Sequence, residues 1–261
     1  MLCKKIILYL IILAFFLSFD KWYTIEIGLL NFIFASIYAI IAFIILKAAY
    51  NLIASYYGLV VDFDLLEIEK TIKKYDHIKK EVIEKKKKHN LSYFLTFIIG
   101  FLSAGYVIPI LFSLDFIVIE SKRLGKSKSL DVTYSEKAKI VFLSTIFVWI
   151  LFSILKYLSS FGAILFGFVH YMYKFLFYYT ISSIIPFCLA LTKILSKMGY
   201  RYLKISIGDI YLMTKKPFLI ASTITLLFLA IFSLILHPLL LIFASIIIYS
   251  VVWLRKYVET I

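Results

Sequence analysis

Long runs of apolar residues alternate with shorter basic segments along this chain. The apolar runs cover residues 6–23, 25–46, 140–155, 157–191 and 218–254. A helix needs about 20 apolar residues to cross the hydrocarbon core of a bilayer. His237 and Pro238 divide the last run into two stretches that are each close to this length. The pattern therefore predicts an all-α, multi-pass helical integral membrane protein with six full spans.

A further apolar segment, residues 91–119, fits a single crossing poorly. It is longer than one span requires and too short for two full crossings. Gly100, Gly105 and Pro109 lie in its middle, where they favour a break in a helix. We expect a broken, re-entrant segment here, and the alternative is one tilted span.

Residues 62–90 form the most polar part of the chain, with seven acidic residues and nine lysines. No Gly or Pro interrupts them, and apolar residues recur at roughly helical spacing. Acid-then-base pairs four residues apart stabilise a helix. Four such pairs occur here: Glu69/Lys73, Asp76/Lys80, Glu81/Lys85 and Glu84/Lys88. The segment is predicted to be a long cytosolic amphipathic helix, or a helical hairpin.

This pattern divides the chain into three parts. Residues 1–47 are expected to form an N-terminal hairpin of two spans, residues 48–90 the cytosolic charged region, and residues 91–261 the C-terminal membrane domain. Within the last part, residues 93–155 and 168–236 each contain a proline in an apolar segment, then a basic linker, then a Ser-Thr-Ile sequence. This order indicates a weak internal repeat, unless the apolar segments match by chance.

Composition supports the membrane interpretation and excludes other classes of protein. The chain is 63% hydrophobic and 17% charged, whereas soluble domains average about 45–50% apolar and about 25% charged residues. A globule of 261 residues cannot bury such an excess of apolar side chains. A soluble protein is therefore excluded, and a disordered protein is excluded for the same reason.

The net charge of +14 orients the predicted loops. Most of the 29 basic residues fall at the two termini and in residues 47–90, 120–139 and 192–217. Because basic loops are retained on the cytoplasmic side during insertion, both termini are expected in the cytoplasm and the protein in the cell membrane. Expected partners are the lipid bilayer, with anionic headgroups at the basic loops, and a protein that binds residues 62–90. No nucleic acid is expected.

Few ionisable residues lie inside the predicted spans. His170 and Lys174 are one helical turn apart in the run 157–191, and Asp115 could compensate the charge of Lys174. Because charged groups are costly inside a bilayer and mark transport pathways, the three residues form a candidate intramembrane polar site. The structural alternative is that Lys174 extends toward the headgroups while His170 donates a hydrogen bond to a neighbouring helix.

Small residues spaced four apart predict close helix packing. Ser159, Ala163 and Gly167 form one such stripe, and Gly100 and Ala104 form a shorter one. Stripes of small residues let two membrane helices approach each other closely. We expect them to pack helices within the chain, and an oligomer interface is the alternative.

Enzyme and metal motifs are not apparent in the sequence. It lacks the His-Glu-x-x-His zinc motif, the Gly-x-Ser-x-Gly nucleophile motif and the Walker phosphate-binding loop. Cys3 and Cys188 are far apart and have no histidine at metal-ligand spacing. Gly208-Asp209 resembles part of the Gly-x-Gly-Asp motif of intramembrane aspartyl proteases, but Ser206 replaces the first glycine. A non-enzymatic protein without cofactor or metal is therefore expected.

Two functions are compatible with these features. The broken segments and the polar set of His170, Lys174 and Asp115 favour a transport or permease-type membrane component. The alternative is a non-catalytic membrane scaffold or assembly factor that acts through its cytosolic basic helix.

Overall fold

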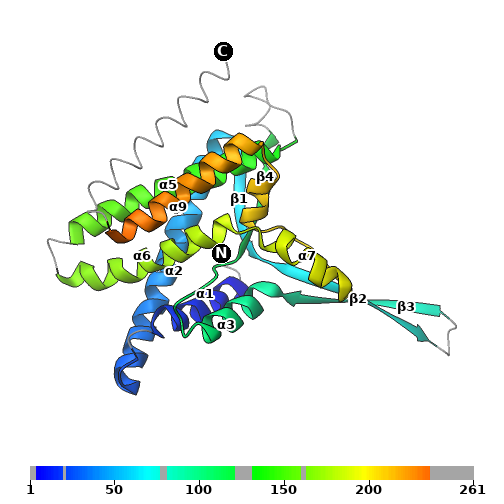
Figure 1. The fold of residues 1–261 in the computed structure, drawn as a ribbon, viewed down its shortest axis with the longest axis horizontal. Helices are drawn as coiled ribbons and strands as arrows, with labels where there is room; N and C mark the ends of the chain where they lie inside the picture. Colours follow the sequence, from blue (N-terminus) through cyan, green and yellow to red (C-terminus); the bar gives the residue numbers. More distant parts are fainter. Residues whose placement is uncertain (1–3, 20–21, 77–80, 121–130, 160–162, 236–261) are drawn as a thin grey trace, which may run out of the picture.

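The chain folds into packed helices joined to two small β-sheets (Figure 1). The computed structural model describes residues 4–19, 22–76, 81–120, 131–159 and 163–235. The helices in these ranges are α1 (Lys4–Leu17), α2 (Ile25–Tyr56), α3 (Leu91–Leu102), α5 (Tyr134–Ser159), α6 (Ala163–Ile184), α7 (Phe187–Lys197), α8 (Ile207–Leu212) and α9 (Lys216–Ile235). The strands are β1 (Leu59–Leu65), β2 (Glu67–Asp76), β3 (Glu81–Asn90), β4 (Phe112–Val118) and β5 (Tyr200–Tyr202).

Within these ranges, two helices are long and apolar enough to cross a bilayer, so the prediction of an all-α protein with six full spans is wrong. The two are α2 and α5, which include the predicted runs 25–46 and 140–155. A third crossing would require α6 and α7 to act as one broken span, and they are bent by 61°. The end of the predicted last run, with His237 and Pro238, lies outside the described residues.

Helix α1 is part of the protein core and is too short for the predicted first span. It has 14 residues, and half of them are buried. The Tyr9 hydroxyl lies 2.9 Å from the Thr96 hydroxyl and accepts a hydrogen bond of 2.8 Å from the backbone N–H of Leu111. Through these contacts, α3 and the segment after it cover one side of α1.

The described residues of the segment 62–90, which are 62–76 and 81–90, form strands and not the predicted amphipathic helix. The four apolar residues at alternate positions of β1 are buried: Leu59, Val61, Phe63 and Leu65. Burying an apolar side chain contributes about 1.5–3 kcal/mol, so the period-two pattern of β1 favours a strand. The charge pairs lie further along the chain, where a helical pair contributes only about 0.2–0.5 kcal/mol and β2 and β3 instead pair with each other at ten positions.

Residues 91–119 form neither a re-entrant segment nor a tilted span. Helix α3 ends at Leu102, and Gly105 adopts a φ of +78°, a backbone conformation that suits glycine. A Cβ at Gly105 would lie 2.8 Å from the Cβ of Phe19. The chain then returns as β4, which pairs antiparallel with β1 from Leu59↔Val118 to Leu65↔Phe112. Because its backbone bonds to a distant strand, the second half of the segment cannot continue as a membrane helix.

The second sheet consists mainly of one long hairpin. β2 and β3 pair over ten positions, from Glu67↔Asn90 to Asp76↔Glu81. β5 pairs with β2 only at Ile68, Glu69 and Lys70, next to the helices. Figure 1 shows the other end of the hairpin extending away from the helical body.

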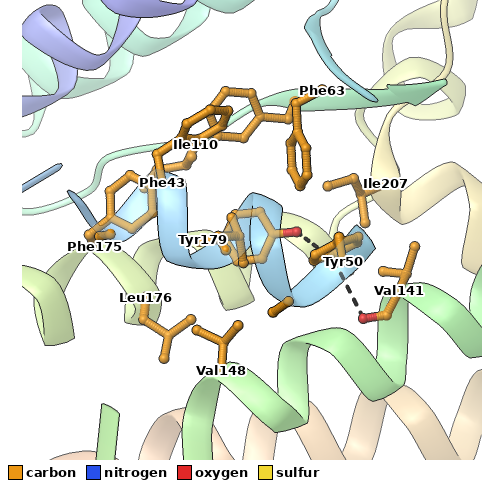
Figure 2. Packing of buried hydrophobic residues seen from close by; sticks show 14 of the residues in the cluster. Phe43, Tyr50, Phe63, Ile110, Val141, Val148, Phe175, Leu176, Tyr179 and Ile207 are labelled. Carbon is orange, nitrogen blue, oxygen red and sulfur yellow. Dashed lines mark hydrogen bonds between the residues drawn. The ribbon is translucent and has the colours of Figure 1, made fainter. Parts of the chain in front are cut away.

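The core of the helical body lies where α2, α5 and α6 meet. The hydroxyls of Tyr50 and Tyr179 are 2.6 Å apart, and both side chains are fully buried (Figure 2). The Tyr50 hydroxyl also lies 3.3 Å from the Thr145 hydroxyl and 3.4 Å from the Val141 carbonyl oxygen. Phe43, Phe63 and other apolar side chains surround the pair. The two tyrosines can be buried because each hydroxyl supplies the other with a hydrogen-bond partner.

Replacing Tyr179 with Phe removes this partner from Tyr50, which keeps Thr145. We expect Tyr179→Phe to lower the free energy of unfolding by about 0.5–1.5 kcal/mol, the usual net contribution of one hydrogen bond. Denaturant unfolding of the purified protein in detergent measures the change. Tyr23→Phe is the control because Tyr23 is 81% exposed. Equal stability of the two variants would contradict the importance of the buried pair.

Candidate functional site

The structure gives the charged members of the predicted polar site different partners. The Lys174 ammonium, on α6, donates a hydrogen bond of 2.9 Å to the carbonyl oxygen of Leu17. Asp115, on β4, accepts one of 2.5 Å from Lys204. His170 is exposed on α6, and its ring contacts that of Tyr171. A shared role of His170, Lys174 and Asp115 stays a prediction.

The predicted packing stripes lie at element boundaries. Ser159 is the last residue of α5 and Ala163 the first of α6, so Ser159, Ala163 and Gly167 are divided between two helices. Gly100 faces α1, where a Cβ would lie 2.9 Å from the ring of Phe16. Ala104 lies beyond the end of α3 and has a φ of 49°. The Gly100 position therefore allows a close approach of α3 to α1, and the other stripe stays a prediction.

A fully buried carboxylate, Asp209, lies at the junction of α6, α7 and α8. Its Oδ2 accepts hydrogen bonds from the Ser206 N–H at 2.9 Å, from the Ser206 hydroxyl at 2.5 Å and from the Cys188 N–H at 3.2 Å. Its Oδ1 accepts one from the Leu189 N–H at 3.1 Å. Cys188 and Leu189 begin α7, while Ser206 caps α8. A single carboxylate therefore binds the N-termini of two helices.

This arrangement explains why a charged group is stable in the interior. Helix N-termini carry unpaired N–H groups and a partial positive charge, which favour an anion. Gly208, beside Asp209, has no side chain, and a Cβ there would lie 2.2 Å from the carbonyl oxygen of Ile185. Only glycine lets α8 approach the end of α6 this closely. Asp209 and Gly208 together hold the bend between α6 and α7.

The chemistry of the Asp209 site is structural. Four hydrogen bonds already occupy its carboxylate. The neighbouring Cys188 thiol is oriented toward the Lys204 carbonyl oxygen, with 3.6 Å between the sulfur and the oxygen. No group of three or more His, Cys, Asp or Glu residues suited to a metal ion occurs within the described ranges.

The sequence does not single out Asp209 as a functional residue, because Ser206 replaces the first glycine of the protease motif and the segment lies in the basic linker 192–217. A signal was present: Ser206 and Asp209 have the Ser-x-x-acid spacing of a capping box, which predicts the start of a helix. The second helix N-terminus, that of α7, comes from another part of the chain. Burial of Asp209 against it could not be read from the motif.

A second charged cluster ties the β1–β4 sheet to the segment before α8. The Lys204 ammonium lies 2.6 Å from Asp64 and 2.5 Å from Asp115. Burial alone would raise the pKa of Asp64, but the hydrogen bond and charge of Lys204 lower it below its ordinary value. Burial alone would lower the pKa of Lys204, but its hydrogen bonds to Asp115 and Asp64 raise it. Asp64 and Lys204 therefore stay charged over a wide range of pH.

Exposed lysines occupy the hairpin of β2 and β3. Lys86, Lys87 and Lys88 on β3 are exposed, and Lys86 lies 3.7 Å from Glu69. Lys87 is directly opposite Lys70 in the register. The Lys70 ammonium lies 5.1 Å from the centre of the Tyr200 ring. Like charges thus face each other across the two strands.

Asp209→Asn places an amide donor among N–H groups that need an acceptor. Each hydrogen bond lost at a buried site costs about 1–3 kcal/mol, so this variant should be strongly destabilised. Limited proteolysis and denaturant unfolding in detergent measure the effect. Glu120→Gln, an exposed carboxylate changed in the same way, serves as the control. Wild-type stability of Asp209→Asn would show that the carboxylate does not hold the junction.

The Lys204 cluster should make stability depend on pH. The contribution of Asp64 is present above its ordinary pKa of 3.8 and is lost as pH falls through the lower folded value. The contribution of Lys204 is present below its ordinary pKa of 10.5 and is lost as pH rises through the higher pKa of the folded protein. The stability difference between the wild type and Lys204→Gln should therefore be constant between these limits and shrink outside them. Unfolding midpoints across the pH range test this, and a difference independent of pH would contradict it.

Comparison with known proteins provides no relative for this chain. No family model matches it, and neither a curated protein nor a solved structure is significantly similar. The functional argument therefore depends on the geometry of its own residues.

Proposed function

We propose that the protein is a multi-pass protein of the cell membrane that acts as a non-catalytic scaffold. Its binding surface is the hairpin of β2 and β3, which takes up an acidic protein partner on the cytoplasmic side. Two helices, α2 and α5, are long and apolar enough to anchor the chain in a bilayer. The basic hairpin lies on the cytoplasmic side by the positive-inside rule.

The observation that carries this proposal is the projection of the hairpin. Beyond Lys70, neither strand pairs with a third strand among the described residues. A hairpin of two strands is only marginally stable in water by itself. The six pairs beyond Lys70, from Thr71↔Lys86 to Asp76↔Glu81, project from the helical body and gain stability when a partner covers them (Figure 1).

The charges of the hairpin define the chemistry of this partner. Lys70 opposite Lys87 is an unfavourable cross-strand pair, which costs about 0.2–1 kcal/mol relative to a neutral one. Lysines on an edge strand also disfavour the addition of a further strand. A partner that offers carboxylates relieves the repulsion, whereas one that adds a strand does not. Ile72 lies between Lys70 and Lys73 in β2. It is 44% exposed and offers the partner an apolar contact.

A transport role is the second candidate, and the break between α6 and α7 favours it. Broken helices whose N-termini face a binding site are frequent in transporters. Here the N-terminus of α7 already binds Asp209. An anionic substrate at this position would have to displace an internal carboxylate.

Lys87→Glu tests the scaffold proposal because its effects on folding and binding are opposite. The substitution replaces the repulsion with Lys70 by an attraction, so the hairpin should be stabilised by about 0.2–1 kcal/mol. Recovery of co-purifying proteins from gently solubilised membranes should nevertheless fall several-fold. Hydrogen exchange of β2 and β3 reports on the hairpin in the same sample.

Lys87→Arg keeps the charge and is the matched control. It should retain the bound proteins. Equal recovery with Lys87→Glu and Lys87→Arg would overturn the proposal. Loss of vesicle binding with unchanged protein recovery would assign the hairpin to lipid headgroups instead.

A further inference from the structure

Helix α7 buries one face against the rest of the protein. Cys188 is 3% exposed, and Leu191 and Leu195 pack on a small apolar cluster. This cluster joins the start of β2 to α3 through Leu66, Ile68 and Leu91. The inward face is narrow, because Cys188 is the one buried residue of α7 and Leu191 and Leu195 are half-buried.

The outward side of α7 carries a separate apolar stripe. Ala190, Ile194 and Met198 are spaced four residues apart, and all three are exposed. Ile194 is 58% exposed and Met198 57%. Residues at this spacing share one side of a helix. Lys193 and Lys197, both exposed, lie next to the stripe at the preceding positions.

The other flank of α7 is mostly polar, although it also carries Leu189, which is 46% exposed. Thr192 and Ser196 are exposed there, about half a turn around the helix from Ile194. The exposed surface of α7 therefore changes from apolar to basic to polar around the axis. An order of this kind is typical of a helix that lies parallel to a membrane surface.

The direction of α7 is set by its connection to α6. The two apolar helices are separated by Ile185 and Pro186 and differ in direction by 61°. Asp209 binds the first N–H groups of α7, and Gly208 packs on the backbone of Ile185. Because both contacts are buried, the bend is a fixed part of the fold.

We propose that α7 is an interfacial helix whose stripe of Ala190, Ile194 and Met198 enters the boundary between headgroups and acyl chains. Lys193 and Lys197 extend beside the stripe to anionic lipid phosphates, which complement their charge. The start of α7 lies beside β4 through the Ser113↔Ser206 bridge, and β4 pairs with β1, which follows the candidate span α2; α7 therefore lies at the end of that span, at the bilayer surface. This inference goes beyond the scaffold function and does not depend on a hairpin partner.

An interfacial α7 also positions the hairpin. Gly199, with a φ of +77°, turns the chain from α7 directly into β5. β5 pairs with Ile68, Glu69 and Lys70 at the base of β2. The base of the hairpin is therefore held close to the membrane surface.

Spin labels on the full-length protein test this inference. Ile194→Cys and Ser196→Cys are prepared with Cys3 and Cys188 replaced by Ala, and the protein is reconstituted in phosphatidylcholine–phosphatidylglycerol vesicles. Molecular oxygen concentrates in lipid, whereas a nickel chelate stays in water. The relaxation of each spin label by oxygen is compared with its relaxation by the chelate. We expect a several-fold higher oxygen-to-nickel ratio at position 194 than at 196. Equal ratios in which nickel dominates, or equal ratios typical of the bilayer centre, would overturn the inference.

The lysines provide a second measurement. Lys193→Glu with Lys197→Glu should bring the label at position 194 closer to water in the anionic vesicles, and much less in pure phosphatidylcholine. Lys193→Arg with Lys197→Arg is the control and should keep the depth. An unchanged depth in the glutamate variant would show that anionic lipid does not bind these residues. Because the readout is membrane depth, failure of the hairpin proposal would leave this result unaffected.

Discussion

The architecture of the second half of the chain depends on one ionic interaction, the binding of the Asp209 carboxylate by the N-termini of α7 and α8. Two helix ends that would otherwise leave N–H groups unpaired in the interior share a single acceptor. Because the bonds have defined directions, they determine the angle at which α7 leaves α6. Everything attached to α7, including β5 and the base of the hairpin, takes its position from that angle.

The same physical rule governs the other polar groups of the interior. The Tyr50 and Tyr179 hydroxyls satisfy each other between α2 and α6, and at the partly exposed edge of the β1–β4 sheet Lys204 pairs with both Asp64 and Asp115. Burial of a polar group costs little when its partners are in place and several kcal/mol when they are absent. The charged groups of the interior are therefore already bound by other groups of the protein. The charges available for binding lie on the outside, on the hairpin and on α7.

The sequence predicted parts of this fold well and others wrongly, for identifiable reasons. Residues 25–46 and 140–155 form helices of spanning length, because a long apolar run has few other stable forms. The helix predicted for residues 62–90 is wrong because helical charge pairs are weak: the first residues belong to the alternately buried strand β1, and the segment with the charge pairs forms the hairpin of β2 and β3. Of the candidate polar set, Lys174 and Asp115 each bind a different partner that is distant in the sequence, Leu17 and Lys204. The burial of Asp209 is not predicted, because only half of its site is local in sequence and the start of α7 comes from 20 residues earlier in the chain.

Local sequence alone determines the apolar character of this chain, two of its long helices, the capping box at Ser206 and Asp209, and the concentration of lysine in residues 62–90. These properties follow from side-chain chemistry within one or two helical turns. Tertiary structure decided that β1 would pair with β4, that α1 would be buried, and that Asp209 would reach the start of α7. Each of these outcomes depends on partners distant in the chain, because backbone pairing and burial are satisfied by whichever groups the fold brings into contact.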